Sequence, residues 1–253
     1  MSGPSFTNSR LSRESYLKNW TRDRDLLVNA ARTHLERRVP TCPLWTVGDL
    51  CTHVANVYEH KTWILALGRF PTNDEFVLER SARETQDPLE RVTRWSEELQ
   101  RQLSERPLDS WASTFMDDDQ NVEFWFRRMA LETLVHRCDA QLASGPISDM
   151  DPELSDDGVD ELLWFWLDEH PDPDNRWRGQ SVVVRSARSS WTITLESNGP
   201  SIVGRDTSDA VAVIQGASGD LLLHVSGRAI TTVQQSGDQD ALDVMREGFE
   251  TFQ

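Results

Sequence analysis

Three polar residues fall on apolar helical faces, where burial costs free energy unless the side chain is paired, hydrogen-bonded or bound to a metal. His53 lies in an apolar stripe, three residues after Leu50 and four before Val57. Glu132 and His136 are four residues apart, so their side chains share one face of a helix that also carries apolar residues. Two histidines and one glutamate are the protein ligands of a type of catalytic zinc site. The alternative is a set of core residues satisfied by hydrogen bonds.

Four amphipathic segments would position these residues. Apolar side chains recur at steps of three and four, which predicts helices. The predicted helices run from Ser12 to Arg38, Thr46 to Gly68, Pro88 to Ser104 and Val122 to Ser144. Thr46 with Asp49 three residues later is a helix-start signal, and Gly145 followed by Pro146 is a stop signal. We therefore expect an antiparallel four-helix bundle over residues 10–146.

The second half of the chain changes in composition. Residues 147–176 form a predicted acidic linker with a helix, because residues 147–175 hold eleven acidic residues, no Lys or Arg, and an apolar cluster at 162–167. Residues 177–253 contain short β-branched runs bounded by Gly, Ser, Asn and Pro, which predict a small α+β domain. Its strands are expected at 181–185, 191–195, 210–214 and 231–234, and its helices at 218–225 and 240–252.

Composition limits the classes of function. The 42 acidic against 26 basic residues leave a net charge of −16, which repels nucleic-acid phosphates and anionic membranes. The chain has neither an apolar run of roughly 18 residues nor a signal-peptide pattern, so we expect a cytoplasmic protein. The 10 Trp residues argue for a folded chain, with a monomer or weak homodimer as the default. Core positions are expected for Cys42, Cys51 and Cys138, whose spacing fits neither a disulfide framework nor a cysteine zinc site.

Two stretches surround the candidate ligands, namely Trp45-Thr-Val-Gly-Asp-Leu-Cys-Thr-His53-Val and Arg128-Met-Ala-Leu-Glu132-Thr-Leu-Val-His136-Arg-Cys-Asp139-Ala. They resemble the two metal-binding helices of the maleylpyruvate isomerase family of mycothiol-dependent enzymes. A third stretch, Asp209 to Arg228, resembles the C-terminal domain of that family, mainly in its pattern from Gly216 onward. The resemblance covers nearly the whole chain. It implies a DinB-like four-helix bundle followed by a small α+β sterol-carrier-like domain.

The resemblance implies that a divalent metal, with zinc as the expected ion, is bound by His53, Glu132 and His136, with water in the open position. It also implies mycothiol as the thiol cosubstrate. A metal-bound thiol is deprotonated and would react as a thiolate with a small electrophilic metabolite. Addition to a conjugated alkene would permit isomerisation, whereas an S-transferase would leave the thiol on the product.

Helix geometry adds two carboxylates to this site. A ligating histidine usually donates its second ring N–H to a carboxylate or carbonyl. Asp49 precedes His53 by four residues, and Asp139 follows His136 by three, so each is placed to accept that hydrogen bond. Asp49 has the alternative role of capping its helix.

Three further residues are candidates for binding the substrate. Asn56 and His60 follow His53 by one and two helical turns and would line the mouth of the bundle, with plain solvent exposure as the alternative. The family pattern implies that Arg228 faces a cleft between the domains, where its guanidinium could hold a substrate carboxylate through two hydrogen bonds. A surface position is the alternative for Arg228. His224 departs from the apolar pattern of the family, and its role stays open.

Two other functions compete with the leading hypothesis of thiol activation. The same metal site could activate water for hydrolysis, since zinc lowers the pKa of bound water to about 7. In a non-catalytic ligand-binding bundle, the three residues would form a buried hydrogen-bonded cluster without a metal. Dependence of the reaction on a thiol separates the first two functions, and metal content separates the third.

Overall fold

The computed structural model describes residues 10–72, 75, 86–169, 176–196, 199–203 and 209–250. The chain divides into two compact units. One comprises Ser12–Asp149, and the other comprises Met1–Leu11 with Met150–Gln253. They are called the helical unit and the sheet unit below.

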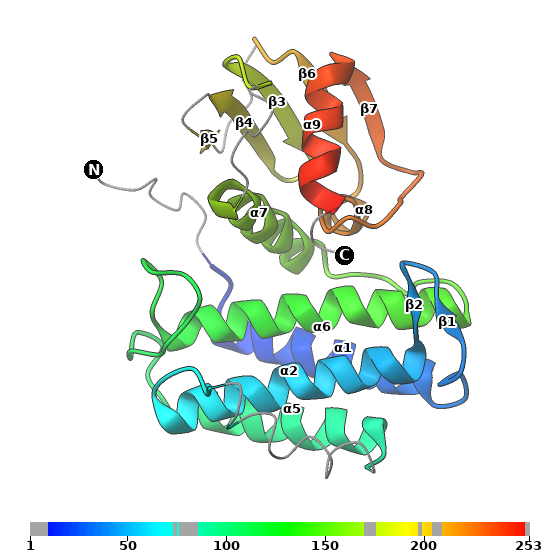
Figure 1. Cartoon of the computed structure of the whole chain (residues 1–253), viewed down its shortest axis with the longest axis vertical. Coiled ribbons are helices and arrows are strands. Elements are labelled where there is room, and N and C mark those ends of the chain that lie inside the picture. Colours follow the sequence, from blue (N-terminus) through cyan, green and yellow to red (C-terminus); the bar gives the residue numbers. More distant parts are fainter. Residues whose placement is uncertain are drawn as a thin grey trace. The chain divides into compact units, whose positions relative to one another are not determined.

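Four helices pack against one another in the helical unit (Figure 1). They are α1 (Arg13–Ala31), α2 (Val47–Leu67), α5 (Pro88–Ser104) and α6 (Val122–Ser144). Helix α1 packs mainly on α6 and α2 mainly on α5, with further contacts between α2 and α6. The large side chains of Trp20, Tyr58 and Trp125 are fully buried between them. Burial of such large rings supplies much of the driving force for this packing.

The bounds of the helices follow from capping. Thr46 and Asp49 form a capping box at the start of α2, and Gly68 ends that helix in the left-handed conformation with φ of 66°. The Asn121 side chain accepts a hydrogen bond from the backbone N–H of Phe124 and starts α6. The predicted bounds of α2, α5 and α6 are therefore close to those in the structure.

The predicted end of the first helix at Arg38 is wrong, because α1 ends at Ala31. The chain then turns back, and the carbonyls of Leu35 and Arg37 accept hydrogen bonds from the backbone N–H groups of Gly48 and Val47 at the start of α2. These hydrogen bonds hold the segment after α1 against the start of α2. The close approach also suits a glycine, since a Cβ on Gly48 would lie 3.3 Å from the Leu35 carbonyl oxygen.

A short antiparallel hairpin, absent from the sequence prediction, connects these helices. It consists of β1 (Arg38–Val39) and β2 (Cys42–Thr46). The strands are too short for a pattern of alternating apolar residues to reveal them. The hairpin matters for function, because it contributes two residues to the candidate site described below.

A buried ion pair joins α1 to α6. The Arg137 Nε atom lies 3.4 Å from Asp23 Oδ1, and both side chains are fully buried. The Arg137 guanidinium also donates hydrogen bonds to the side chains of Gln141 and Ser148. Because Arg137 directly follows His136, this pair anchors α6 beside the candidate ligand.

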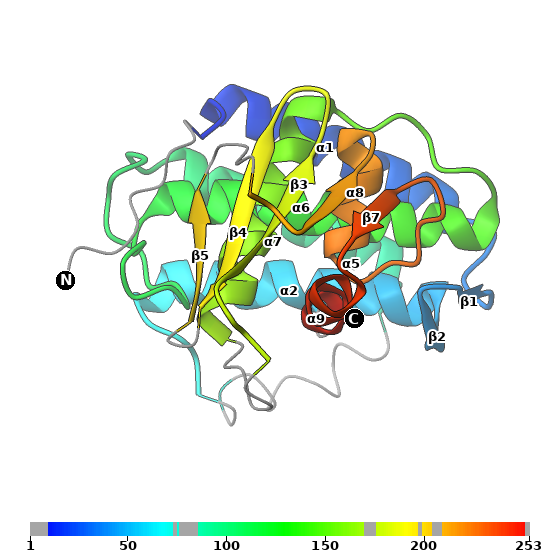
Figure 2. The ribbon, with the colours of Figure 1, turned by 90° about the horizontal axis from the view of Figure 1, so that it is seen from above.

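The sheet unit contains a five-stranded sheet in the order β5-β4-β3-β6-β7. The strands are β3 (Gln180–Arg185), β4 (Ser190–Glu196), β5 (Gly199–Val203), β6 (Ala212–Gln215) and β7 (Gln234–Gly237). Strands β3 and β6 are parallel, and the other neighbours are antiparallel. Figure 2 shows β5, β4 and β3 side by side. The helices are α7 (Pro152–Glu169), α8 (Ser218–Val225) and α9 (Gln239–Glu250).

Two strands of this sheet depart from the prediction. Strand β5 was not expected, because Gly199 and Pro200 suggest a turn, although a proline is tolerated in an edge strand. Strand β7 lies at Gln234–Gly237 rather than at 231–234, and its side chains are all exposed. An exposed polar edge strand has no apolar alternation from which its bounds could be predicted.

Acidic side chains attach α7 to the turn between β3 and β4. Asp156 accepts hydrogen bonds from the hydroxyls of Ser186 and Ser189, and Asp160 accepts one from the Trp191 indole. Helix α7 also packs against α8 and β5. The helix predicted within an acidic linker is thus an integral part of the sheet unit.

Two of the three cysteines occupy core positions. Cys51 and Cys138 are buried, while Cys42 is half-buried. Burial, with a smaller contribution from the Asp87 charge, raises the pKa of the Cys51 thiol to about 12. This thiol therefore stays protonated at neutral pH. None of the helices in the described part of the chain is long and apolar enough to span a membrane.

Candidate metal centre

Helices α2 and α6 bring His53, Glu132 and His136 together. One potential ligand atom of each residue lies within 4.8 Å of the others. Glu132 Oε1 is 3.1 Å from His136 Nε2 and 3.4 Å from His53 Nε2. The two imidazole rings meet edge to face, with centroids 5.1 Å apart. Three donors from facing helices thus converge, as in metal sites built inside helical bundles.

Asp139 fixes the orientation of His136. Its Oδ2 atom lies 3.0 Å from His136 Nδ1. An ionised carboxylate only accepts hydrogen bonds, so Nδ1 carries a proton and Nε2 is turned toward Glu132. The Thr41 hydroxyl, in the turn between β1 and β2, donates to Asp139 Oδ1 at 2.6 Å. The spacing of Asp139 predicted its place beside His136, whereas Thr41 is distant in sequence and was missed.

Arg128 orients Glu132 and was also missed. Its guanidinium donates to Glu132 Oε2 at 2.7 Å. This bond occupies one carboxylate oxygen and leaves Oε1 facing the two histidines. The signal was present in the sequence, since Arg128 precedes Glu132 by four residues on the same helical face.

His53 packs against the indole of Trp45, whose ring centroid is 5.0 Å from that of the imidazole. Trp45 belongs to β2, so the hairpin contacts the centre a second time. The side chain of His53 is 37% exposed, against 12% for His136. The centre is therefore more open to solvent on the side of His53.

Asp49 does not have the position expected beside His53. Its Oδ2 atom accepts hydrogen bonds from both the backbone N–H and the hydroxyl of Thr46, at 2.8 and 2.7 Å. These bonds lower the pKa of Asp49. The carboxylate is used to cap α2, which was the alternative role at the sequence level.

The charge balance of the cluster suits a bound cation. Burial acts to raise the pKa of Glu132, but the nearby His136, His53 and Arg128 outweigh it and hold that pKa well below its usual value. Burial likewise opposes protonation of His136, yet Glu132 and Asp139 raise its pKa to about 9. The two carboxylates thus favour a positive charge on His136, whose Nε2 faces Glu132 and whose Nδ1 faces Asp139. A divalent cation can replace the proton there, so the donor set fits a metal.

Asn56 and His60 have partners of their own on or beside α2. Asn56 Oδ1 accepts a hydrogen bond from Arg91 at 2.7 Å, and the same Arg91 nitrogen lies 2.9 Å from Glu59 Oε2. His60 Nδ1 is 3.0 Å from the Lys61 ammonium. Asn56 thus helps to hold α2 against α5. Asn56 and His60 are both half-buried, so neither is the plainly solvent-exposed residue that was the alternative at the sequence level.

Arg228 and His224 lie in the sheet unit. Arg228 is only 5% exposed, and its guanidinium donates to the Ser226 carbonyl at 2.6 Å. It is therefore not a plain surface residue. His224 packs edge to face on Phe249 with ring centroids 5.6 Å apart, and burial lowers its pKa.

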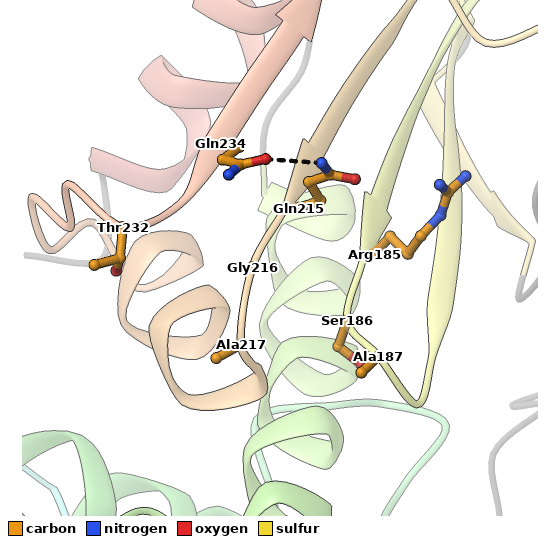
Figure 3. Close-up of a pocket in the computed structure, with 8 residues that line it drawn as sticks. All are labelled: Arg185, Ser186, Ala187, Gln215, Gly216, Ala217, Thr232 and Gln234. Atoms are coloured by element: carbon orange, nitrogen blue, oxygen red, sulfur yellow. Dashed lines mark hydrogen bonds between the residues drawn. The ribbon is translucent and has the colours of Figure 1, made fainter.

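The sheet unit also contains a cavity of about 390 Å³ (Figure 3). Its walls include Arg185 and Ser186 at the end of β3, and Gly216 and Ala217 before α8. A hydrogen bond of 2.9 Å between the side chains of Gln215 and Gln234 crosses its rim. No role was expected here from the sequence.

A match to the sequence model of a known protein family shows which family this chain belongs to. The model is described as the mycothiol maleylpyruvate isomerase N-terminal domain, and it matches residues 10–141, more than half of the chain. The chain belongs to this family. The resemblance inferred from the residues around His53 and Glu132 is thereby confirmed. A comparison with curated protein sequences finds no significant match.

Solved structures of mycothiol-dependent maleylpyruvate isomerase share the fold. The crystal structure of that enzyme covers 90% of this chain and 95% of its own, with a TM-score of 0.64 and 13% identity. The crystal structure of a histidine-to-alanine mutant covers the same shares, with a TM-score of 0.63 and 13% identity. At this identity the likeness is one of fold.

Replacing Asp139 with asparagine should weaken metal binding. The NH₂ group of the amide cannot accept a hydrogen bond from His136 Nδ1. The amide also lacks the negative charge that makes the imidazole a stronger metal ligand. Loss of such an outer hydrogen-bond partner typically lowers metal affinity by roughly 10–100-fold. Competition with a coloured chelator would measure it.

The matched control is Asp49→Asn, which alters the α2 cap but not the hydrogen bond to His136. We expect the Asp49→Asn protein to bind metal as the unaltered chain does. Equal metal affinity in all three proteins would refute the role of Asp139.

Proposed function

We propose that this chain is a metal-dependent enzyme that activates a low-molecular-weight thiol, mycothiol, for reaction with a small electrophilic metabolite. The observation that carries the proposal is the convergence of His53, Glu132 and His136 on facing helices. Membership of the mycothiol maleylpyruvate isomerase family supports the choice of thiol. The name of the structural relative, mycothiol-dependent maleylpyruvate isomerase, makes thiol-assisted isomerisation the first reaction to test, with S-transfer as the second.

In this proposal Nε2 of both histidines and Oε1 of Glu132 hold the metal. When bound, a divalent metal would lower the pKa of a small thiol so that it is present as a thiolate at neutral pH. Two nitrogens and one oxygen are a donor set suited to zinc, which is the expected ion. Three protein ligands would leave a position for an exogenous ligand, as catalytic zinc sites do.

The surrounding residues keep these donors in place. Asp139 holds the Nδ1 proton of His136, and Thr41 in turn holds Asp139. Arg128 holds the second oxygen of Glu132. Because each donor is oriented by a hydrogen bond or, for His53, by the ring of Trp45, little reorganisation would accompany metal binding.

The finer expectations from the sequence belong to the same proposal. They are a DinB-like bundle and a sterol-carrier-like C-terminal domain, a cytoplasmic location, and a monomer or weak homodimer. Substrate contacts are proposed for Asn56, His60 and Arg228, with Arg228 binding a substrate carboxylate.

The test combines metal analysis with a thiol-dependence assay. We expect about one equivalent of divalent metal per chain, consistent with one three-donor site. Maleylpyruvate would be offered with and without mycothiol, followed by a panel of thiol conjugates. Turnover should need both the thiol and the metal and should stop when a chelator is added.

The outcomes separate the alternatives. Turnover of esters or amides without any thiol would favour hydrolysis by activated water. Purified protein with far less than one equivalent of metal, and with stability unchanged by chelator, would instead support a non-catalytic hydrogen-bonded cluster.

A further inference from the structure

Lys61 on α2 carries an ammonium group in unusual surroundings. Its Nζ atom lies 3.0 Å from His60 Nδ1 and 5.2 Å from the centre of the Trp125 ring. The side chain is half-buried. Among the residues that the structure describes, no carboxylate lies within ion-pairing distance of it. Removing a cation from water costs free energy unless a counter-ion compensates. No carboxylate among the described residues pairs with Lys61 to compensate this cost.

The contacts of Lys61 do not neutralise its charge. Burial and the charge of Lys61 lower the pKa of His60 to about 4, so His60 is a neutral acceptor at pH 7. The Trp125 ring offers its face, which attracts a cation but does not neutralise it. Burial also lowers the pKa of Lys61 to about 8, an effect that the Glu132 charge partly offsets. At neutral pH most of the Lys61 side chains are therefore still protonated.

Lys61 also lies on the helical face that leads to the metal centre. Trp125, Arg128 and Glu132 follow one another at steps of three and four on α6, so they share one face. Lys61 contacts the first of them, Trp125, and Glu132 follows Trp125 by seven positions, about 10 Å along the helix axis. Helices α2 and α6 are in contact (Figure 1), and a hydrogen bond of 2.5 Å joins the hydroxyls of Tyr58 on α2 and Thr133 on α6.

Arg128, between the two, already has a carboxylate partner. Its guanidinium is engaged by Glu132 Oε2 at 2.7 Å. Lys61 is thus the basic side chain near the candidate metal ligands that lacks a carboxylate partner in the described part of the chain.

We propose that the Lys61 ammonium binds a carboxylate of the small molecule that reacts at the metal centre. The inference rests on the proposed function, since it assigns to that reaction an anionic substrate. The carboxylate would supply the missing counter-ion, and the Trp125 ring would form an apolar wall beside it. A substrate would then need a carboxylate within about 10 Å of its reacting carbon, the helical distance from Trp125 to Glu132.

The composition of the chain allows a direct test. Its two lysines are Lys18 and Lys61, and Lys18 is exposed on α1. Reductive methylation with ¹³C-formaldehyde keeps the charge and labels each lysine, together with the amino terminus, for NMR. Succinate should shift the Lys61 signal and leave the Lys18 signal in place, while the neutral succinamide should shift neither. No shift at Lys61 with succinate, or equal shifts with succinamide, would overturn the proposal.

Variants of the unmethylated protein give the second readout. Lys61→Met keeps an unbranched apolar stem on Trp125 and removes the charge, and Lys18→Met is the matched control. A charge-assisted hydrogen bond contributes about 1.5–3 kcal/mol, so succinate affinity by calorimetry should fall roughly 10–100-fold in Lys61→Met only. Lys61→Arg should retain part of the affinity. If Lys61→Met binds succinate as well as the unaltered protein does, the proposal is wrong.

A separate pair of results distinguishes this inference from the proposed function. The His136→Ala protein should lose metal yet still show the Lys61 shift with succinate. If the unaltered protein binds no metal while Lys61 responds, the proposed function fails and the anion site stands. If metal is bound and the Lys61 signal does not shift with succinate, the anion site is refuted and the proposed function stands. Where turnover is found, Lys61→Met should raise KM about tenfold with little change in kcat, as loss of uniform substrate binding does.

Discussion

Replacing His136 with alanine is expected to abolish metal binding and, with it, any metal-dependent activity. The change removes one of three donor atoms and leaves Glu132 and Asp139 facing each other without the imidazole between them. Loss of a direct ligand should reduce affinity by more than the roughly 10–100-fold that loss of an outer hydrogen-bond partner costs. Metal analysis of the purified protein by mass spectrometry would measure the effect.

His34→Ala is the matched control for this variant. His34 lies in the turn after α1, where its Nδ1 atom is 3.1 Å from the Ala30 carbonyl, outside the cluster. This protein should retain the metal. Full metal occupancy in His136→Ala, with circular dichroism indicating a native fold, would contradict the assignment of the site.

The dependence of metal binding on pH follows from the same geometry. Because the pKa of His136 is raised to about 9, its imidazole is largely protonated at neutral pH in the metal-free protein. A metal must displace that proton, so affinity should rise about tenfold per pH unit between about pH 6 and 8. Chelator competition at several pH values would measure the slope. A flat profile would mean that His136 is not a ligand.

The second large effect concerns stability, and it is expected for Asp23→Ala. This change leaves the fully buried guanidinium of Arg137 without its carboxylate partner. Breaking a buried ion pair by removing one partner typically costs about 3–5 kcal/mol. We expect the free energy of unfolding, measured by urea denaturation, to fall by about that amount. Such a loss approaches half of the stability of a typical domain.

Asp25→Ala is the control on the same helix, since Asp25 is 59% exposed in its pair with Arg24. An exposed pair contributes about 0–1 kcal/mol, so this variant should remain close to the unaltered protein. If Asp23→Ala does not fold well enough to be measured, Asp23→Asn keeps the shape and removes only the charge, and it should show a smaller loss. Equal stability of Asp23→Asn and the unaltered protein would refute the importance of the pair.

Much of the helical unit could be predicted because its signals are local. Helix α6 begins after Asn121 and ends before Gly145, and both residues act through hydrogen bonds to their near neighbours. The end of α1 could not be predicted in this way. It depends on hydrogen bonds from Gly48 and Val47 to the carbonyls of Leu35 and Arg37, which form only when α2 is already docked. The exposed polar strand β7 was predicted at 231–234, three residues too early, because it has no apolar alternation that would fix its bounds.

The sequence by itself determined which residues are candidates for the metal centre. Helical spacing placed Glu132, His136 and Asp139 together, and the family relationship, confirmed over residues 10–141, agrees with the choice of these stretches. Only the tertiary structure decided how they are held. It brought Thr41 to Asp139 and Trp45 to His53, and it assigned Asp49 to the α2 cap. The reason is physical: helix periodicity fixes neighbours within a few residues, whereas contacts between a hairpin and two helices depend on how the whole unit packs.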